Sequence, residues 1–178
     1  MSRRIVTISQ SLGRVAALVF ACAAVAGGMS GCQPSPPISQ AVPYPISLTL
    51  PKEVRIHSFT GTKVFGEGDK AVRGLEVHIE ARDSYGDPTK AFGDFRFELY
   101  SFAPMSPDPK GKLITRWNVS LLEPKNNALH WWNVSRTYVF QLRSDTPLKA
   151  GQQFVLVTTF SSPYTERLFS QRVFTAGQ

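Results

Sequence analysis

Apolar and polar side chains alternate along much of the chain after residue 45. This period of two residues places apolar side chains on one face of a β-strand and polar side chains on the other. The clearest examples are residues 75–81 and 95–99, and further strands are expected at residues 46–50, 54–59, 112–121, 134–143, 153–161 and 167–175. Residues 154–160 are apolar on both faces, which predicts a central strand that is covered on both sides.

The intervals between these runs are rich in residues that favour turns, at residues 83–88, 107–111, 123–127 and 147–151. No stretch after residue 45 carries a helical apolar period over three turns. About eight short strands predict an all-β fold, a single antiparallel β-sandwich of the immunoglobulin-like or C2-like kind over residues 46–178. The strand and D-x-x-G-x-P turn of residues 74–88 are similar to those of bacterial immunoglobulin-like modules, and this similarity implies the same architecture.

The first 31 residues have the features of an export signal. Arg3, Arg4 and Arg14 occur without any acidic residue, and an apolar run at residues 15–28 follows them. A helix of this run would be about 21 Å long, which is short of the roughly 30 Å hydrocarbon core of a bilayer. Residues 1–31 are therefore predicted to be a signal peptide rather than a permanent transmembrane helix.

The signal is followed directly by Met29-Ser30-Gly31-Cys32. These residues resemble the lipobox of bacterial lipoproteins, with Met in the place usually held by Leu. The resemblance implies cleavage before Cys32, a diacylglyceryl group on its thiol and acylation of the new amino terminus, so that a lipid bilayer is the first partner of the chain. The alternative is an ordinary signal peptide that is cut near Gly31 and leaves Cys32 unmodified.

Cysteine usage favours lipidation. Cys22 lies in the predicted signal peptide, which leaves Cys32 as the one cysteine of the mature chain. An unpaired thiol is unusual in an exported protein unless it is modified.

Residues 32–45 are predicted to be the lipidated cysteine and a proline-rich tether with a reach of up to roughly 40 Å. Gln33 follows the cysteine, and by resemblance to the sorting rule of enteric-type bacteria this implies the outer membrane of the cell envelope rather than the inner one.

The charge distribution argues against one class of partner. Removal of the signal peptide lowers the formal net charge from +7 to +4, and the remaining basic residues are scattered. Proteins that bind nucleic acids gather Lys and Arg in a run or on one face. We therefore expect no nucleic-acid partner.

The sequence lacks the short motifs of the common catalytic classes, such as G-x-S-x-G, H-E-x-x-H and S-x-x-K. His57, His78 and His130 are far apart in sequence, and alternation predicts a solvated His78 on a polar face between two glutamates. Asp83 and Asp87 are interpreted as turn residues, because the D-x-D-x-D spacing of a calcium loop is missing. We expect no enzymatic activity, no metal and no cofactor.

The candidate ligand-binding residues are His130, Trp131, Trp132 and Asn133. Aromatic rings beside amide and imidazole groups can stack on sugar rings and hydrogen-bond to their hydroxyls. Neighbouring residues of a strand point to opposite faces, so at least one of Trp131 and Trp132 is expected in the core. The chain has three tryptophans, Trp117, Trp131 and Trp132. We expect two of the three to pack in the core.

Three functions remain open. The leading one is a membrane-anchored cell-envelope lipoprotein that is not an enzyme and whose β-sandwich binds an unknown envelope protein or has a structural role. The second is a module that binds cell-wall or surface glycan through exposed aromatic residues. The third, an enzyme, would require His and carboxylate groups to converge in a cleft. An exposed tryptophan beside polar side chains would favour the glycan-binding module.

Overall fold

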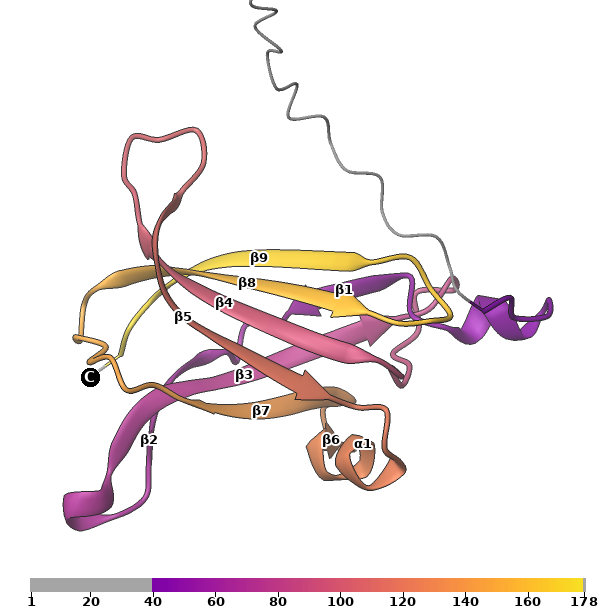
Figure 1. Cartoon of the computed structure of the whole chain (residues 1–178), viewed down its shortest axis with the longest axis horizontal. Coiled ribbons are helices and arrows are strands. Elements are labelled where there is room, and N and C mark those ends of the chain that lie inside the picture. The colour runs from indigo at the N-terminus through magenta and orange to yellow at the C-terminus, as the bar shows by residue number, and fades with distance from the viewer. Residues whose placement is uncertain (1–39, 178) are drawn as a thin grey trace, which may run out of the picture. The chain divides into compact units, whose positions relative to one another are not determined.

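Two antiparallel sheets face each other in the computed structural model, which describes residues 40–177 (Figure 1). The β3 sheet contains β1 (Glu53–Ile56), β2 (Gly61–Phe65), β3 (Val72–Arg82), β6 (Trp131–Trp132) and β7 (Thr137–Arg143). The β4 sheet contains β4 (Asp94–Phe102), β5 (Lys110–Ser120), β8 (Gln153–Ser161) and β9 (Leu168–Thr175). The predicted all-β sandwich is confirmed, with nine strands in the described residues where about eight are expected.

The strand order is β1-β3-β7-β6 in the β3 sheet, with β2 also paired to β3, and β5-β4-β8-β9 in the β4 sheet. The predicted signal peptide (1–31), Cys32 and residues 33–39 of the predicted tether lie outside the described residues. Within residues 40–177, no helix is both long enough and apolar enough to cross a membrane.

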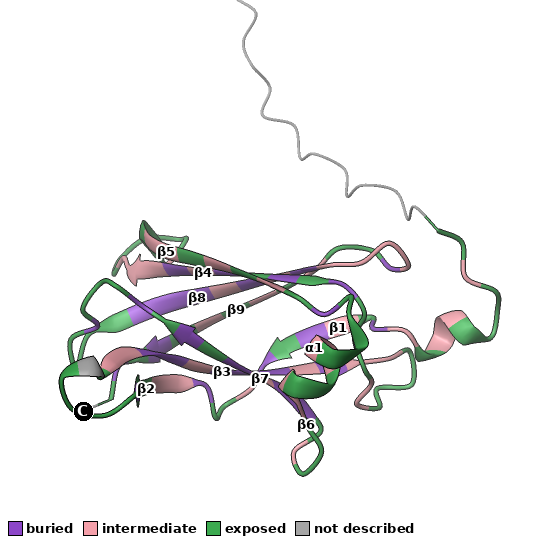
Figure 2. Ribbon diagram, turned by 60° about the horizontal axis from the view of Figure 1, so that its bottom comes forward, coloured by how far each residue is buried: buried purple, intermediate pink, exposed green. Residues whose placement is uncertain are grey.

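The apolar residues of the alternating runs form the core between the two sheets (Figure 2). Phe95, Phe97 and Leu99 of β4 have no exposed surface, as their alternation predicts. The ring of Phe97 lies 4.9 Å from the ring of Phe140 in β7, so aromatic side chains of the two sheets pack directly on one another. β8 lies between β4 and β9, which confirms the predicted central strand. It is covered on both faces only at residues 154–156, because the outward residues Val157 and Thr159 are partly exposed.

Side-chain hydrogen bonds join the two sheets along both of their long sides. On one side, the N–H of Ile56 in β1 donates to the hydroxyl of Ser170 in β9 at 3.1 Å. On the other side, the indole N–H of Trp117 in β5 donates to the carbonyl of Arg143 in β7 at 2.7 Å. Trp117 also packs against the core, so it contributes to the closure of the sandwich.

The edge strand β5 pairs irregularly with β4. The pairing shifts register on both sides of Tyr100, which is the mark of a β-bulge or a related irregularity. The first four residues of β5 are exposed, and they include Lys110 and Lys112. One side of β5 has no strand partner among the described residues.

Residues 46–50 do not form the predicted strand. They contain a short 3-10 helix, η1 (Ile46–Thr49), in which no residue is buried. The carbonyl of Leu48 accepts the N–H of Ser84, and the carbonyl of Thr49 accepts the hydroxyl of Thr89. The strand prediction is wrong here because the alternating pattern does not face a core. Hydrogen bonds with the turn between β3 and β4 satisfy part of the backbone instead.

Three further elements depart from the sequence prediction. β2 lies in an interval where no strand is predicted, and Phe65 is its one buried residue. A second 3-10 helix, η2 (Gly68–Lys70), follows it. α1 (Pro124–His130) occupies an interval where a turn is predicted. Pro124 lies in its first turn, where the missing N–H removes no helical hydrogen bond.

Candidate functional site

The segment that contains the candidate residues is fixed to the sandwich by a buried polar cluster. The side-chain amide of Asn127 in α1 donates to the carbonyls of Ala91 and Leu121, at 2.6 and 3.2 Å. The hydroxyl of Tyr138 in β7 donates to the side-chain oxygen of Asn127 at 2.9 Å and accepts the N–H of Ala91 at 2.9 Å. Burial raises the pKa of Tyr138, although its bonds with Ala91 and Asn127 act in the opposite direction. α1 and the start of β6 are therefore held in one position on the edge of β7.

Trp131 and Trp132 point to opposite sides, as neighbouring strand residues must. The ring of Trp131 packs against the core and lies 5.0 Å from the ring of Tyr138. Its indole N–H donates to Asn133 at 2.7 Å, and the ammonium of Lys90 lies 5.4 Å from its ring centre. Trp132 is 49% exposed. Trp117 and Trp131 are thus the two tryptophans that pack on the core, and Trp132 is the one that faces solvent.

The side chain of His130 contacts neighbouring residues of β7. Its Nδ1 atom lies 3.0 Å from the carbonyl oxygen of Val139, and its ring lies 4.8 Å from the ring of Phe140. His130 also lines a hollow of about 300 Å³ together with Leu129, Val139 and Gln141. Of the four candidate residues, Trp132 is the one whose side chain is exposed and has no hydrogen bond or ion pair within the described residues.

Trp132 belongs to a row of rings on the outer surface of the β3 sheet, which we call the aromatic face: His57, Phe59, His78 and Trp132. The ring centres of His57 and Phe59 are 4.5 Å apart, those of Phe59 and His78 are 5.9 Å apart, and those of His78 and Trp132 are 6.0 Å apart. Phe59 is 65% exposed. The structure therefore brings together two histidines and two aromatic residues that are distant in the sequence.

His78 is buried, with 4% of its surface exposed, so the predicted solvated histidine is wrong. Alternation places it correctly on the outer face of β3, but Phe59 and Trp132 lie against its ring. The Nε2 atom is 3.5 Å from a carboxylate oxygen of Glu76, and Nδ1 has no hydrogen-bond partner among the described residues. The covering residues come from a turn and from β6, and strand periodicity contains no information about either.

The turn that carries Phe59 is bonded to the backbone of His78. The N–H of His57 donates to the carbonyl of His78 at 2.8 Å, and the N–H of His78 donates to the hydroxyl of Thr60 at 3.0 Å. These bonds on both sides of Phe59 hold its ring next to the imidazole. These backbone hydrogen bonds, rather than burial of the Phe59 side chain, fix the position of Phe59, because most of its surface is exposed.

Charged residues border the aromatic face on one side. Glu76 is hydrogen-bonded to Lys63 of β2 and also contacts His78. Burial alone would raise the pKa of Glu76, but the hydrogen bond and charge of Lys63, together with His78, outweigh it and the pKa is lowered. Glu76 is therefore held as a carboxylate at the border of an otherwise apolar surface.

The other acidic candidates take part in turns. One carboxylate oxygen of Asp83 accepts the N–H groups of Tyr85 and Asp87, at 2.9 and 3.0 Å. Within residues 40–177, no group of three or more His, Cys, Asp or Glu side chains has the arrangement of a metal site. Within these described residues, the one contact between a histidine and a carboxylate is that of His78 with Glu76, on the outer face of the β3 sheet.

Comparison with known proteins gives no relative: no family model, curated protein or solved structure matches this chain. The functional argument therefore depends on the surfaces of the molecule. Sequence reasoning finds Trp132 but not Phe59 or His78 as parts of the same surface. The signal that could have found them is weak, since it consists of an isolated phenylalanine in a turn and one histidine in a strand.

Proposed function

We propose that this chain is a lipid-anchored lipoprotein of the bacterial cell envelope, and that its immunoglobulin-like or C2-like sandwich binds an envelope protein without catalysing a reaction. The observation that carries the binding role is the aromatic face, in which Phe59 and Trp132 are exposed on both sides of a buried imidazole. Exposed aromatic rings with a charged border are typical of the central residues of protein interfaces.

Lipid anchoring is supported by the sequence Met29-Ser30-Gly31-Cys32 and by the absence of any other cysteine after the signal. Mass spectrometry of protein extracted from membranes should find an N-terminal peptide that begins at a diacylglyceryl-modified Cys32. The Cys32→Ala variant should leave the membrane fraction. Unchanged recovery of a processed Cys32→Ala variant in the membrane fraction would contradict anchoring by this residue.

The protein-binding role can be tested by photo-crosslinking in cells. A photoreactive phenylalanine analogue at position 59 should give one discrete adduct with an envelope protein, identifiable by mass spectrometry. The same analogue at Met105 is the matched control, since Met105 is fully accessible in the loop between β4 and β5. Adding Trp132→Ala to the position 59 probe should remove the adduct. Equal adducts from both probe positions would count against a specific surface.

Glycan binding is the second candidate function, because Trp132 is exposed beside His78. Under this alternative the full chain, purified in a detergent without a sugar headgroup, sediments with purified peptidoglycan. Trp132→Ala should then abolish sedimentation, and Trp132→Phe should retain most of it because a ring that can stack remains. Sedimentation of wild type and Trp132→Ala in equal amounts would exclude this use of Trp132.

A further inference from the structure

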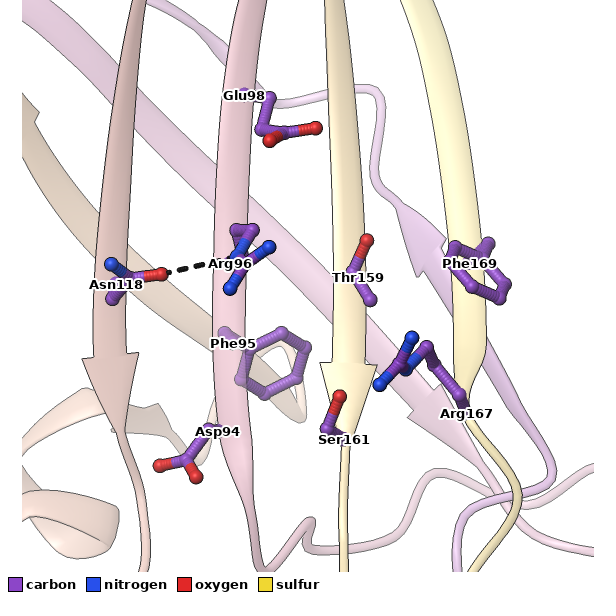
Figure 3. A pocket seen from close by; sticks show the side chains of 9 residues that line it. All are labelled: Asp94, Phe95, Arg96, Glu98, Asn118, Thr159, Ser161, Arg167 and Phe169. Atoms are coloured by element: carbon purple, nitrogen blue, oxygen red, sulfur yellow. Dashed lines mark hydrogen bonds between the residues drawn. The ribbon is translucent and has the colours of Figure 1, made fainter. Parts of the chain in front are cut away.

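A polar groove crosses all four strands of the other sheet, on its outer face (Figure 3). Its volume is about 360 Å³. It is lined by Asn118 of β5, Arg96 of β4, Thr159 and Ser161 of β8, Phe169 of β9 and Arg167 just before β9. Two carboxylates of β4, those of Asp94 and Glu98, line it as well. With strands spaced about 4.8 Å apart, the groove is about 14 Å wide from β5 to β9, which is more than one pyranose ring.

The two arginines of this groove are free to bind an anion. Arg167 has no ion-pair partner among the described residues, and Figure 3 shows its guanidinium pointing toward Thr159 and Ser161. Arg96 makes one long hydrogen bond, from Nε–H to the side-chain oxygen of Asn118 at 3.4 Å. A guanidinium group has five N–H donors in a planar array that matches a carboxylate or phosphate, so most of the donors of both groups are unused.

The two carboxylates that line the groove offset only part of this positive charge, because neither forms an ion pair with Arg96 or Arg167 among the described residues. Glu98 is ion-paired with Arg116 at 2.8 Å and accepts the hydroxyl of Tyr100 at 3.0 Å. Asp94 lies at the end of β4 and its carboxylate points away from Arg167 (Figure 3). The centre of the groove, between Arg96 and Arg167, is therefore the place where a negative group is favoured.

The remaining lining residues specify the rest of the ligand. Asn118, Thr159 and Ser161 offer amide and hydroxyl groups, which donate and accept hydrogen bonds. Phe169 is 61% exposed and supplies one flat apolar ring at the edge. A ligand that fits has many hydroxyls, one apolar flat face and a negative charge, and an acidic sugar has all three. A protein surface would need more apolar area than one phenylalanine provides.

We propose that the outer face of the β4 sheet binds a saccharide whose sugar rings carry carboxylate groups, with Arg96 and Arg167 on the carboxylates and Phe169 against a ring face. This inference concerns the sheet opposite the aromatic face and does not depend on the function proposed above. Each can fail without the other, because no residue is shared between the two surfaces.

The test is a binding titration of the full chain in a zwitterionic detergent that has no sugar headgroup. The probes are the trimers of galacturonate and mannuronate, together with the methyl ester of each trimer, which keeps the rings but removes the charge. We expect at least one acidic trimer to bind about tenfold or more tightly than its own ester, because hydrogen bonds to a charged group are roughly twice as strong as those between neutral groups. Arg96→Gln and Arg167→Gln should each weaken binding by about the same factor, and Phe169→Ala should weaken the ester as well as the acid.

Two controls make the result specific. Arg143→Gln removes the same charge from an exposed position of β7 and should leave the affinity unchanged, as should Trp132→Ala. Inorganic phosphate measures binding of a bare anion. The proposal is overturned if neither trimer binds at millimolar concentration, if an ester binds as well as its acid, if phosphate binds as tightly as the trimers, or if Arg143→Gln weakens binding as much as Arg96→Gln.

Discussion

The strands of both sheets have the same alternating sequence pattern, yet the outer faces of the two sheets are different surfaces. In β3, the outward residue His78 is buried because Phe59 and Trp132 lie against it. In β4, the outward residue Arg96 stays exposed, and its neighbours across the sheet are polar. Alternation therefore determines the direction of a side chain, while its exposure depends on segments that arrive from elsewhere in the chain.

The difference also separates the kinds of ligand that the two faces suit. The aromatic face presents apolar rings with Glu76 and Lys63 at its border. The groove presents two guanidinium groups and two carboxylates, together with amide and hydroxyl groups and one exposed phenylalanine. Burial of apolar area favours a protein surface on the first, and charge-assisted hydrogen bonds favour a small anionic ligand on the second. One small domain thus offers two independent surfaces.

The largest expected effect concerns the two faces of β4 itself. Phe97→Ala removes a fully buried ring and should lower the free energy of unfolding by about 3–5 kcal/mol. Arg96→Ala, one residue away on the exposed face, should lower it by less than about 1 kcal/mol. Denaturant titrations of a fragment of residues 40–178 give both values. A greater cost for Arg96→Ala would mean that the register of β4 is shifted by one residue.

The next effect tests the polar cluster around Tyr138 of the β3 sheet. Tyr138→Phe leaves the N–H of Ala91 and the side chain of Asn127 without their shared partner, which should cost about 1–3 kcal/mol. The pKa of Tyr138 is raised, so its contribution to stability is complete below the unfolded pKa of about 10 and is lost as pH rises through the folded value. Titrations between pH 8 and pH 11 should show a smaller alkaline loss in the variant. If the wild type and the variant lose the same stability at alkaline pH, ionisation of the Tyr138 hydroxyl is not coupled to unfolding.

A smaller effect compares outward residues at the centre of each sheet. His78→Ala removes a ring that packs between Phe59 and Trp132, and should lower the free energy of unfolding by about 1–2 kcal/mol. Thr159→Ala, on the outer face of β8, should change it by less than about 0.5 kcal/mol. Thermal and denaturant melts of both variants measure the difference. Equal costs would mean that the outer face of the β3 sheet is no better packed than that of the β4 sheet.

The smallest effect concerns the border of the aromatic face. The pKa of Glu76 is lowered in the folded chain, so its stabilising contribution is present above the unfolded pKa of about 4.3 and is lost as pH falls through the folded value. Glu76→Gln should reduce the loss of stability between pH 6 and pH 3 by less than about 1 kcal/mol. Glu67→Gln, in the exposed turn after β2, is the matched control. A larger effect from the control would assign the acid sensitivity to another part of the chain.

Much of the fold was predictable because the strands that form the core alternate strictly between apolar and polar residues. Phe95, Phe97 and Leu99 form a pattern that can be buried on only one face of a strand, and the structure buries them there. β2 and η1 were not predictable in this way, since their residues are mostly half-buried or exposed. For α1 a signal existed, because Pro124 is favoured in the first turn of a helix, but Asn126 and Asn127 equally favour a turn.

The candidate sites were less predictable than the fold. Alternation separates Trp131 from Trp132 correctly, and this follows from strand geometry alone. The meeting of Phe59, His78 and Trp132 depends on how a turn and a two-residue strand fold over β3, and no local pattern contains that information. The groove is harder still, because Arg96, Thr159 and Phe169 each look like an ordinary outward residue until the order of β4, β8 and β9 is known.

The irregular edge strand β5 has a consequence for how copies of this domain behave when they are crowded. A long, flat strand with an unpaired side is a template on which another chain can add, and this is a common route to aggregation. The pairing of β5 with β4 shifts register opposite Tyr100 of β4, and β5 carries lysines at its exposed start. Both features hinder the approach of a second strand. Replacing Lys110 and Lys112 with Thr should therefore lower the concentration at which the domain begins to aggregate while leaving its folded structure intact.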